Sequence, residues 1–215
     1  MEVKFIKSFV REAAALPQVL DSVGVPFESI NHVNWPDEYP YRPEVKFRLG
    51  YSPNGLLVHY LVTEDSVRAR YGQDNGHVWT DSCVEFFCQF EAGDIYYNIE
   101  TNCIGTVLLG AGKGRENREL GDADSVGSIQ RWASLGRKPF EEREGQVTWE
   151  LALIIPFTAF FKHRLRSFEG KTVRANFYKC GDELKQPHFL SWNPIELPKP
   201  DFHCPKFFGL LDFEG

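Results

Sequence analysis

Residues 79–90 decide the fold of this chain and read WTDSCVEFFCQF. Apolar side chains recur at every second position after residue 83, which is the period of a β-strand. One face of the predicted strand therefore belongs to a hydrophobic core and carries Val84, Phe86, Cys88 and Phe90. The other face carries Glu85, Phe87 and Gln89.

A β-hairpin is predicted directly after this strand. Residues 91–94 lead into a second alternating run, 95–102, and a linker of that length is typical of a hairpin. If Phe90 pairs with Ile95, Glu85 lies directly opposite Glu100, with Asn98 and Asn102 on the same face. Two opposed carboxylates repel each other, so this face predicts a cation, an arginine or a ligand between them.

A third alternating run, 173–177, offers polar partners for the two glutamates. Arg174, Asn176 and Tyr178 share its polar side, and Arg174 is the candidate cation. The alternative is that these polar groups form a solvated outer face in a different strand register.

Further runs with period two cover most of the chain. Residues 45–51 and 147–151 alternate, residues 56–62 are strand-like on both faces, and turns such as Pro53-Asn54-Gly55 separate the runs. Many short strands predict an all-β antiparallel β-sandwich, immunoglobulin-like or jelly-roll-like. We expect one domain over residues 1–215 with an N-terminal extension, 1–26. Short peripheral helices are expected within 12–23 and 156–161, and a long exposed loop over 110–127.

Composition and charge exclude several classes of function. The net charge of −6 leaves no basic face for nucleic acid and no polybasic anchor for a membrane surface. Five cysteines without a CxxC pair indicate reduced, mostly buried thiols rather than a disulfide framework. The N-terminus has no apolar stretch typical of a signal peptide. A soluble protein is expected, either cytoplasmic or secreted after removal of a leader, and the oligomeric state stays open.

The ordered motifs resemble those of family 9 carbohydrate-binding modules. The segment Trp79-x-Asp81-Ser82-x-Val84-Glu85-Phe86-Phe87 is similar to the W-x-x-D-S-V-E strand of that family. Residues 31–35, 174–178, Ser191-Trp192 and a closing strand at 207–211 follow in the family's order, so the resemblance spans residues 27–213.

The resemblance implies a binding function without catalysis. In that family two tryptophans sandwich a sugar at a chain end, a glycan reducing end, in polysaccharides such as xylan or cellulose. Trp79 and Trp192 match the two tryptophans. The ligand-binding residues expected on these combined grounds are Trp79, Glu85, Asn98, Glu100, Asn102, Arg174, Asn176 and Trp192.

The chain also departs from the family pattern. Cys83 interrupts the D-S-V-E spacing, and residues 96–98 lack an arginine that some members use to bind sugar. The loop 112–115 could supply another cation. Members bind calcium structurally, and Asp81 is the candidate ligand here, although no contiguous calcium loop is present. No other cofactor is expected. Ordinary packing rather than zinc binding is expected for Cys180, His188, His203 and Cys204, because their spacing matches no common zinc site.

Two further classes of function stay open. A glycoside hydrolase could use Glu85 and Glu100 as nucleophile and acid, because opposed residues of an antiparallel pair have Cβ atoms about 5 Å apart, near the carboxyl separation of retaining enzymes. A structural domain with a decayed sugar site is the other alternative.

Overall fold

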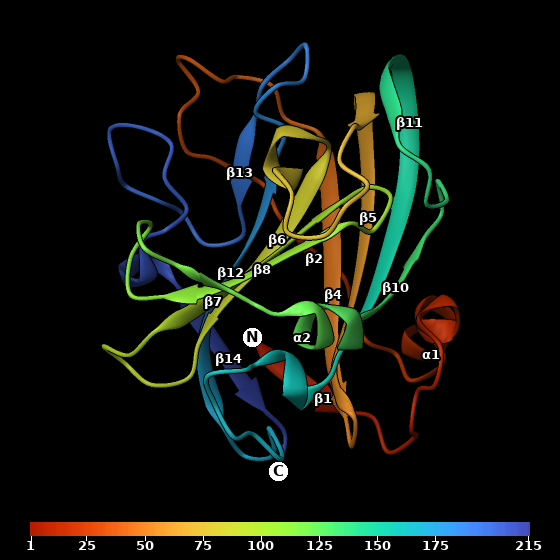
Figure 1. The fold of residues 1–215 in the computed structure, drawn as a ribbon, viewed down its shortest axis with the longest axis vertical. Coiled ribbons are helices and arrows are strands. Elements are labelled where there is room, and N and C mark those ends of the chain that lie inside the picture. The colour runs from red at the N-terminus through yellow and green to blue at the C-terminus, as the bar shows by residue number, and fades with distance from the viewer.

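The computed structural model describes residues 1–215 as a curled β-sheet folded into two layers that face each other (Figure 1). The first layer has the strand order β10 (Gln130–Ala133), β11 (Phe140–Ile155), β5 (Gly55–Ala69) and β4 (Glu44–Ser52). The second has the order β14 (Gly209–Phe213), β12 (Thr172–Cys180), β6 (Cys83–Gln89), β7 (Tyr96–Asn102), β8 (Val107–Gly112) and β9 (Glu119–Leu120). The predicted antiparallel sandwich is confirmed.

Strand β1 (Glu2–Phe5) links the two layers, because it pairs in parallel with β14 and then with β4. The short strands β2 (Glu28–Ser29), β13 (Phe189–Ser191) and β3 (His32–Val33) extend the edges on β4, β12 and β13. Every strand pair other than the two that β1 makes is antiparallel. Residues 1–26, expected to be an extension, thus supply a strand that holds the two layers together.

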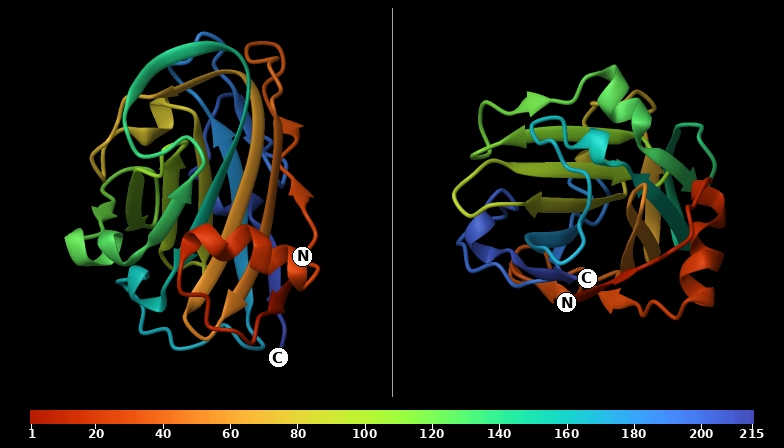
Figure 2. Two further views of the ribbon diagram at one scale, coloured as in Figure 1. Left: turned by 90° about the vertical axis from the view of Figure 1, so that its right-hand side faces the viewer. Right: turned by 90° about the horizontal axis from the view of Figure 1, so that it is seen from below.

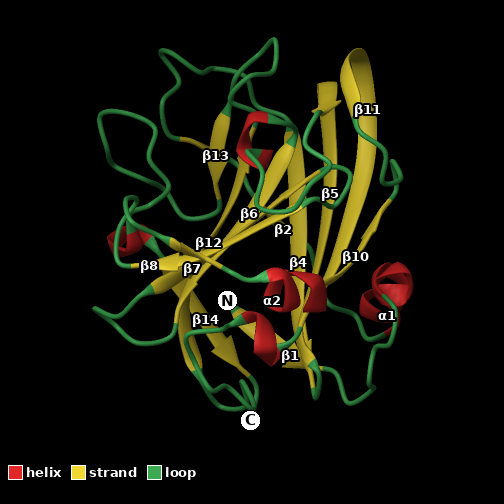
Figure 3. Cartoon of the chain, in the orientation of Figure 1, coloured by secondary structure: helices red, strands yellow, loops and turns green.

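Helices are few and peripheral, as Figure 3 shows. The α-helices are α1 (Leu16–Ser22) and α2 (Ala123–Ser128), and 3₁₀ turns cover Ala13–Ala15, Val78–Thr80, Phe157–Ala159 and Pro205–Phe207. Helices were expected near α1 and at Phe157–Ala159, and both are present. None of these helices has the length and apolar character needed to cross a lipid bilayer.

The main core lies between the two layers. Phe177 of β12 stacks on Phe47 of β4 with ring centroids 3.8 Å apart, and on Phe86 of β6 at 4.9 Å. Trp149, which alternates in phase with Val147 and Leu151, is fully buried there. Burying each such side chain contributes about 1.5–3 kcal/mol, so these contacts hold the layers face to face.

The outer face of each layer is also covered. Helix α1 lies on the outside of β5 and β11 (Figure 2), and its Leu16 and Leu20 belong to an apolar cluster with residues of those strands. On the other side, residues after β13 cover β6, β7 and β12 with Ile195, Phe202 and Phe208. The face of β6 that carries Glu85 and Phe87 is therefore buried beneath a second apolar cluster rather than solvated.

The segment 110–127 differs from the long exposed loop expected for it. It contains the end of β8, strand β9 and the start of α2. The Asp122 carboxylate accepts a hydrogen bond from the Ser125 backbone N–H and caps α2 at its N-terminus, and Val126 of that helix is buried. The Asp122 cap and the buried side chain of Val126 thus hold the end of a segment whose composition is typical of a loop.

Candidate functional site

A cavity of about 310 Å³ opens on the outer face of the second layer. Residues of β6, β7 and β8 form its floor, and its walls come from the turn before β6, the segment 110–127, the end of β12, β13 and residues 200–203. The lining residues are Trp79, Glu85, Asn98, Glu100, Leu108, Gly110, Arg115, Arg118, Leu120, Cys180, Asp182, Phe189, Pro200, Asp201, Phe202 and His203. Four of the eight residues predicted to bind ligand meet here: Trp79, Glu85, Asn98 and Glu100.

The floor carries the predicted carboxylate pair. Glu85 of β6 lies directly opposite Glu100 of β7, and the two residues are 3% and 5% exposed. The Cys180 thiol donates to Glu85 Oε1 at 3.1 Å, and Asn98 Nδ2 donates to Glu100 Oε1 at 2.8 Å. Glu100 Oε2 is buried without a protein partner. The pair therefore presents an acceptor that nothing within the chain satisfies.

Burial changes the protonation of this pair. Burial, with a smaller contribution from the charge of Glu100, raises the pKa of Glu85 well above its ordinary value. Burial also raises the pKa of Glu100 to about 7, although the hydrogen bond from Asn98 opposes the shift. Both shifts favour the protonated form of these two groups, in which a carboxyl can donate a hydrogen bond as well as accept one. The electrostatic repulsion expected from two opposed carboxylates is thereby avoided.

Two arginines of the segment 110–127 line the same cavity. Arg118 donates from Nε to Asn98 Oδ1 and from Nη2 to the Tyr96 carbonyl, both at 2.9 Å, and its guanidinium lies 4.2 Å from the centre of the Tyr96 ring. Arg115 is more exposed. The sequence indicated that residues 112–115 could supply a cation to the site. It did not indicate Arg118, because no pattern in the sequence shows that Arg118 lies next to Asn98.

Aromatic side chains form the opposing walls. Trp79 lies in the 3₁₀ turn before β6, is half-buried, and stacks on His77 with ring centroids 4.6 Å apart. Phe202 stacks on Tyr178 at 4.1 Å and an interplanar angle of 6°. Phe202, Phe189 and His203 all come from the end of the chain, which folds back over the second layer. The sequence did not indicate a role in ligand binding for any of these three residues, and His203 was expected only to pack.

Trp192 does not reach this cavity, so the prediction that Trp79 and Trp192 flank one cleft is wrong. The indole of Trp192 packs edge-on against Phe47 and Phe177, both with ring centroids at 5.9 Å, in the core between the layers. Trp79 packs on the outer cluster instead. Trp192 is in phase with Leu190, which points into the main core, and this alternation places it on the inner face.

The other three predicted residues also lie outside the cavity lining. Arg174 donates to Gln89 Oε1 at 3.4 Å and to the Pro205 carbonyl at 2.8 Å. The Asn176 side chain is paired with the backbone of Asn193, donating from Nδ2 and accepting at Oδ1. Asn102 Nδ2 donates to the Tyr71 carbonyl and to Asp81 Oδ2. These three side chains hold neighbouring segments against the sheet.

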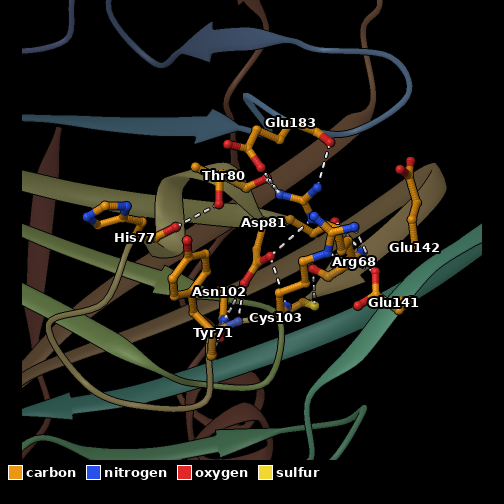
Figure 4. Close-up of polar contacts among 12 residues, drawn as sticks. Arg68, Tyr71, His77, Thr80, Asp81, Asn102, Cys103, Glu141, Glu142 and Glu183 are labelled. Carbon is orange, nitrogen blue, oxygen red and sulfur yellow. Dashed lines mark hydrogen bonds and ion pairs between the residues drawn. The ribbon is translucent and has the colours of Figure 1, made fainter.

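Asp81 does not fit the expected role of calcium ligand. Its Oδ1 accepts from Arg68 Nε and the Arg70 N–H, and its Oδ2 accepts from the Tyr71 N–H and Asn102 Nδ2 (Figure 4). Both carboxylate oxygens are thus occupied by donors, one of them a buried guanidinium. A cation would have to displace an arginine, so the motif aspartate is a structural anchor.

The sequence model of carbohydrate-binding family 9 matches residues 14–213. The chain belongs to this family. Among solved structures, a Bacteroides uniformis protein that is only provisionally assigned as carbohydrate-binding is 49% identical, with a TM-score of 0.96 over 100% of this chain and 98% of its own.

More distant family 9 structures share the fold. A module of Caldicellulosiruptor kristjanssonii in complex with glucose is 11% identical, with a TM-score of 0.62 over 100% of this chain and 95% of its own. The same organism's module in complex with cellotriose is 12% identical, with a TM-score of 0.62 over 100% and 94%. No curated protein matches the chain. Family 9 membership supports carbohydrate binding without catalysis as the class of function.

Proposed function

We propose that the chain binds a neutral sugar, without transforming it, in the cavity above Glu85 and Glu100. The observation that carries this proposal is the meeting of a half-buried tryptophan with a buried carboxyl pair in one cavity. Small-molecule sites combine an apolar wall with a few fixed polar groups, and this cavity has both.

The groups present suit the chemistry of a pyranose. A sugar ring offers a flat face of CH groups, which can pack on the indole of Trp79. Its hydroxyls lie around the edge, where Glu100 Oε2 can accept a hydrogen bond and the carboxyl of Glu85, whose pKa burial raises, can exchange one. Arg115 and Asp201 at the cavity rim can address further hydroxyls. In place of a second tryptophan, Phe189 and Phe202 supply the remaining aromatic surface.

The size of the cavity favours recognition of a chain end. At about 310 Å³ it lies at the lower limit of typical small-molecule sites. One or two sugar units fill such a space, so we propose that the ligand is a terminal unit of a glycan, with the reducing end as the first candidate.

Calorimetric titration tests the site with a matched pair of variants. The ligands are glucose, xylose and cellobiose. Trp79→Ala should weaken binding about tenfold, because a stacked aromatic side chain contributes on the order of 1–1.5 kcal/mol. Trp192→Ala is the control, since that tryptophan is also half-buried but lies on the other side of the second layer. It should leave affinity unchanged.

Two results would contradict the proposal. One is sugar binding that survives Trp79→Ala and is lost in Trp192→Ala, which would place the site elsewhere. The other is no sugar binding by the wild type, which would favour the structural-domain alternative. Cellobiose reduced with borohydride tests the terminal unit, because loss of binding on reduction is expected only if the reducing end is held.

A further inference from the structure

Two cysteines and one glutamate converge at one edge of the cavity floor. Cys83 of β6 lies directly opposite Cys180 of β12, and Glu85 follows two residues after Cys83 on the same face. One sulfur or oxygen atom from each of the three side chains lies within 4.8 Å of the other two. All three residues are buried. The arrangement depends on strand pairing, because the two cysteines are far apart in the sequence.

The separation of these atoms suits a tetrahedral metal ion. Zinc binds sulfur at about 2.3 Å and carboxylate oxygen at about 2.1 Å, so two such ligands lie roughly 3.6 Å apart across a tetrahedral angle. Cys180 Sγ and Glu85 Oε1 are 3.1 Å apart, which requires only a small side-chain adjustment. Two sulfur ligands favour zinc or a similar soft cation and disfavour calcium, which takes oxygen ligands.

The cluster is also connected to the cavity. Glu85 and Cys180 line the cavity, whereas Cys83 is fully buried and is not among the lining residues. A metal held by three protein ligands would therefore keep a fourth position open toward the cavity, the arrangement that distinguishes reactive or ligand-binding zinc sites from closed structural ones. The charge of Lys179 favours the ionised forms of Cys83 and Glu85, which a metal requires, whereas burial opposes them.

We propose that Cys83, Cys180 and Glu85 bind a thiophilic divalent cation such as Zn²⁺, with one coordination position open to the cavity. The site goes beyond sugar binding and does not rest on it, but the two share Glu85: a metal takes the ionised carboxylate, so Glu85 does not donate a hydrogen bond to a sugar while the metal is bound. The ligands come from paired strands rather than from a CxxC motif, and for this reason the spacing of cysteines in the sequence does not mark it.

Cobalt titration tests this site directly. The full chain is kept reduced with a phosphine, freed of metal by a chelator and titrated with Co²⁺, which reports tetrahedral thiolate ligation by intense visible bands and a sulfur-to-metal charge-transfer band. We expect saturation at one equivalent and displacement by one equivalent of Zn²⁺. Cys180→Ser and Glu85→Gln should each weaken binding by at least the roughly 10–100-fold that loss of a supporting partner costs. Cys88→Ser is the control, because Cys88 is equally buried on β6 but faces the main core.

A second measurement uses the wild type alone, so its result does not depend on whether the variants fold. The resonance of bound ¹¹³Cd²⁺ depends on the number of thiolate ligands and should indicate two sulfurs with oxygen. The proposal is overturned if no saturable cobalt binding occurs, if the cadmium resonance indicates oxygen ligands alone, or if Cys88→Ser abolishes the cobalt bands as fully as Cys180→Ser. These readouts contain no sugar, so a failure here is distinct from a failure of the proposed sugar site.

Discussion

Replacing Asp81 with asparagine should destabilise the fold severely, although the side chain keeps its shape. Asp81 is fully buried and receives four donors, two on each oxygen. The asparagine side chain has only one acceptor oxygen. Its NH₂ group would therefore face two of these N–H donors, and neither would have an acceptor. In addition, Arg68, whose side chain is 3% exposed, would lose its buried counter-charge.

The expected cost is about 3–5 kcal/mol, the range measured when one partner of a buried ion pair is removed. Glu183 offers Arg68 little compensation, because its carboxylate lies 3.2 Å away but is mostly exposed, and such pairs contribute at most about 1 kcal/mol. A loss of this size is a large fraction of the roughly 5–15 kcal/mol that stabilises a typical domain.

Urea denaturation of the wild type and Asp81→Asn measures this loss as a shift in the free energy of unfolding. Glu141→Gln is the control, since the ion pair of Glu141 with Arg70 is exposed and its removal should leave no resolvable change. A cost below about 1 kcal/mol for Asp81→Asn would refute the reasoning, because it would mean that the Arg68–Asp81 pair is solvated or replaceable.

Two further predictions concern pH and catalysis. Burial, together with the charge of Lys179 2.7 Å from Nε2, holds the pKa of His188 well below its ordinary value. The unfolded chain therefore binds a proton near pH 6.5 that the folded chain does not, and stability should fall as pH drops below 6.5, by up to about 1.4 kcal/mol per unit. Urea denaturation from pH 7 to pH 5 should show a shallower fall for His188→Gln than for the wild type, and equal slopes would contradict this assignment. We also expect no hydrolysis of chromogenic glycosides; turnover that disappears in both Glu85→Gln and Glu100→Gln would establish the hydrolase alternative instead.

The hairpin shows how far local pattern predicts a site. Alternation over residues 84–90 and the length of the linker suggested a pairing of Glu85 with Glu100 but left another register open, and the structure confirms the first. Alternation also indicated which residues of β6 face the main core. It could not show that the opposite face is buried, because the residues that cover it, such as Phe202, lie more than 100 positions along the chain.

The amino-acid sequence by itself indicated the all-β class and the family, and it offered the register that pairs Glu85 with Glu100 as one of two alternatives. The alternation of apolar and polar residues and the lengths of the turns are local properties of the sequence. They therefore indicate strands and hairpins regardless of where these lie in the fold. The tertiary structure alone decided which side chains share the cavity. Trp192 lies in the core, and Arg118, Cys180 and His203 reach the cavity floor and walls. The physical reason is that a cavity is enclosed by segments distant in sequence, whose relative positions depend on how the two layers and the C-terminal segment pack together.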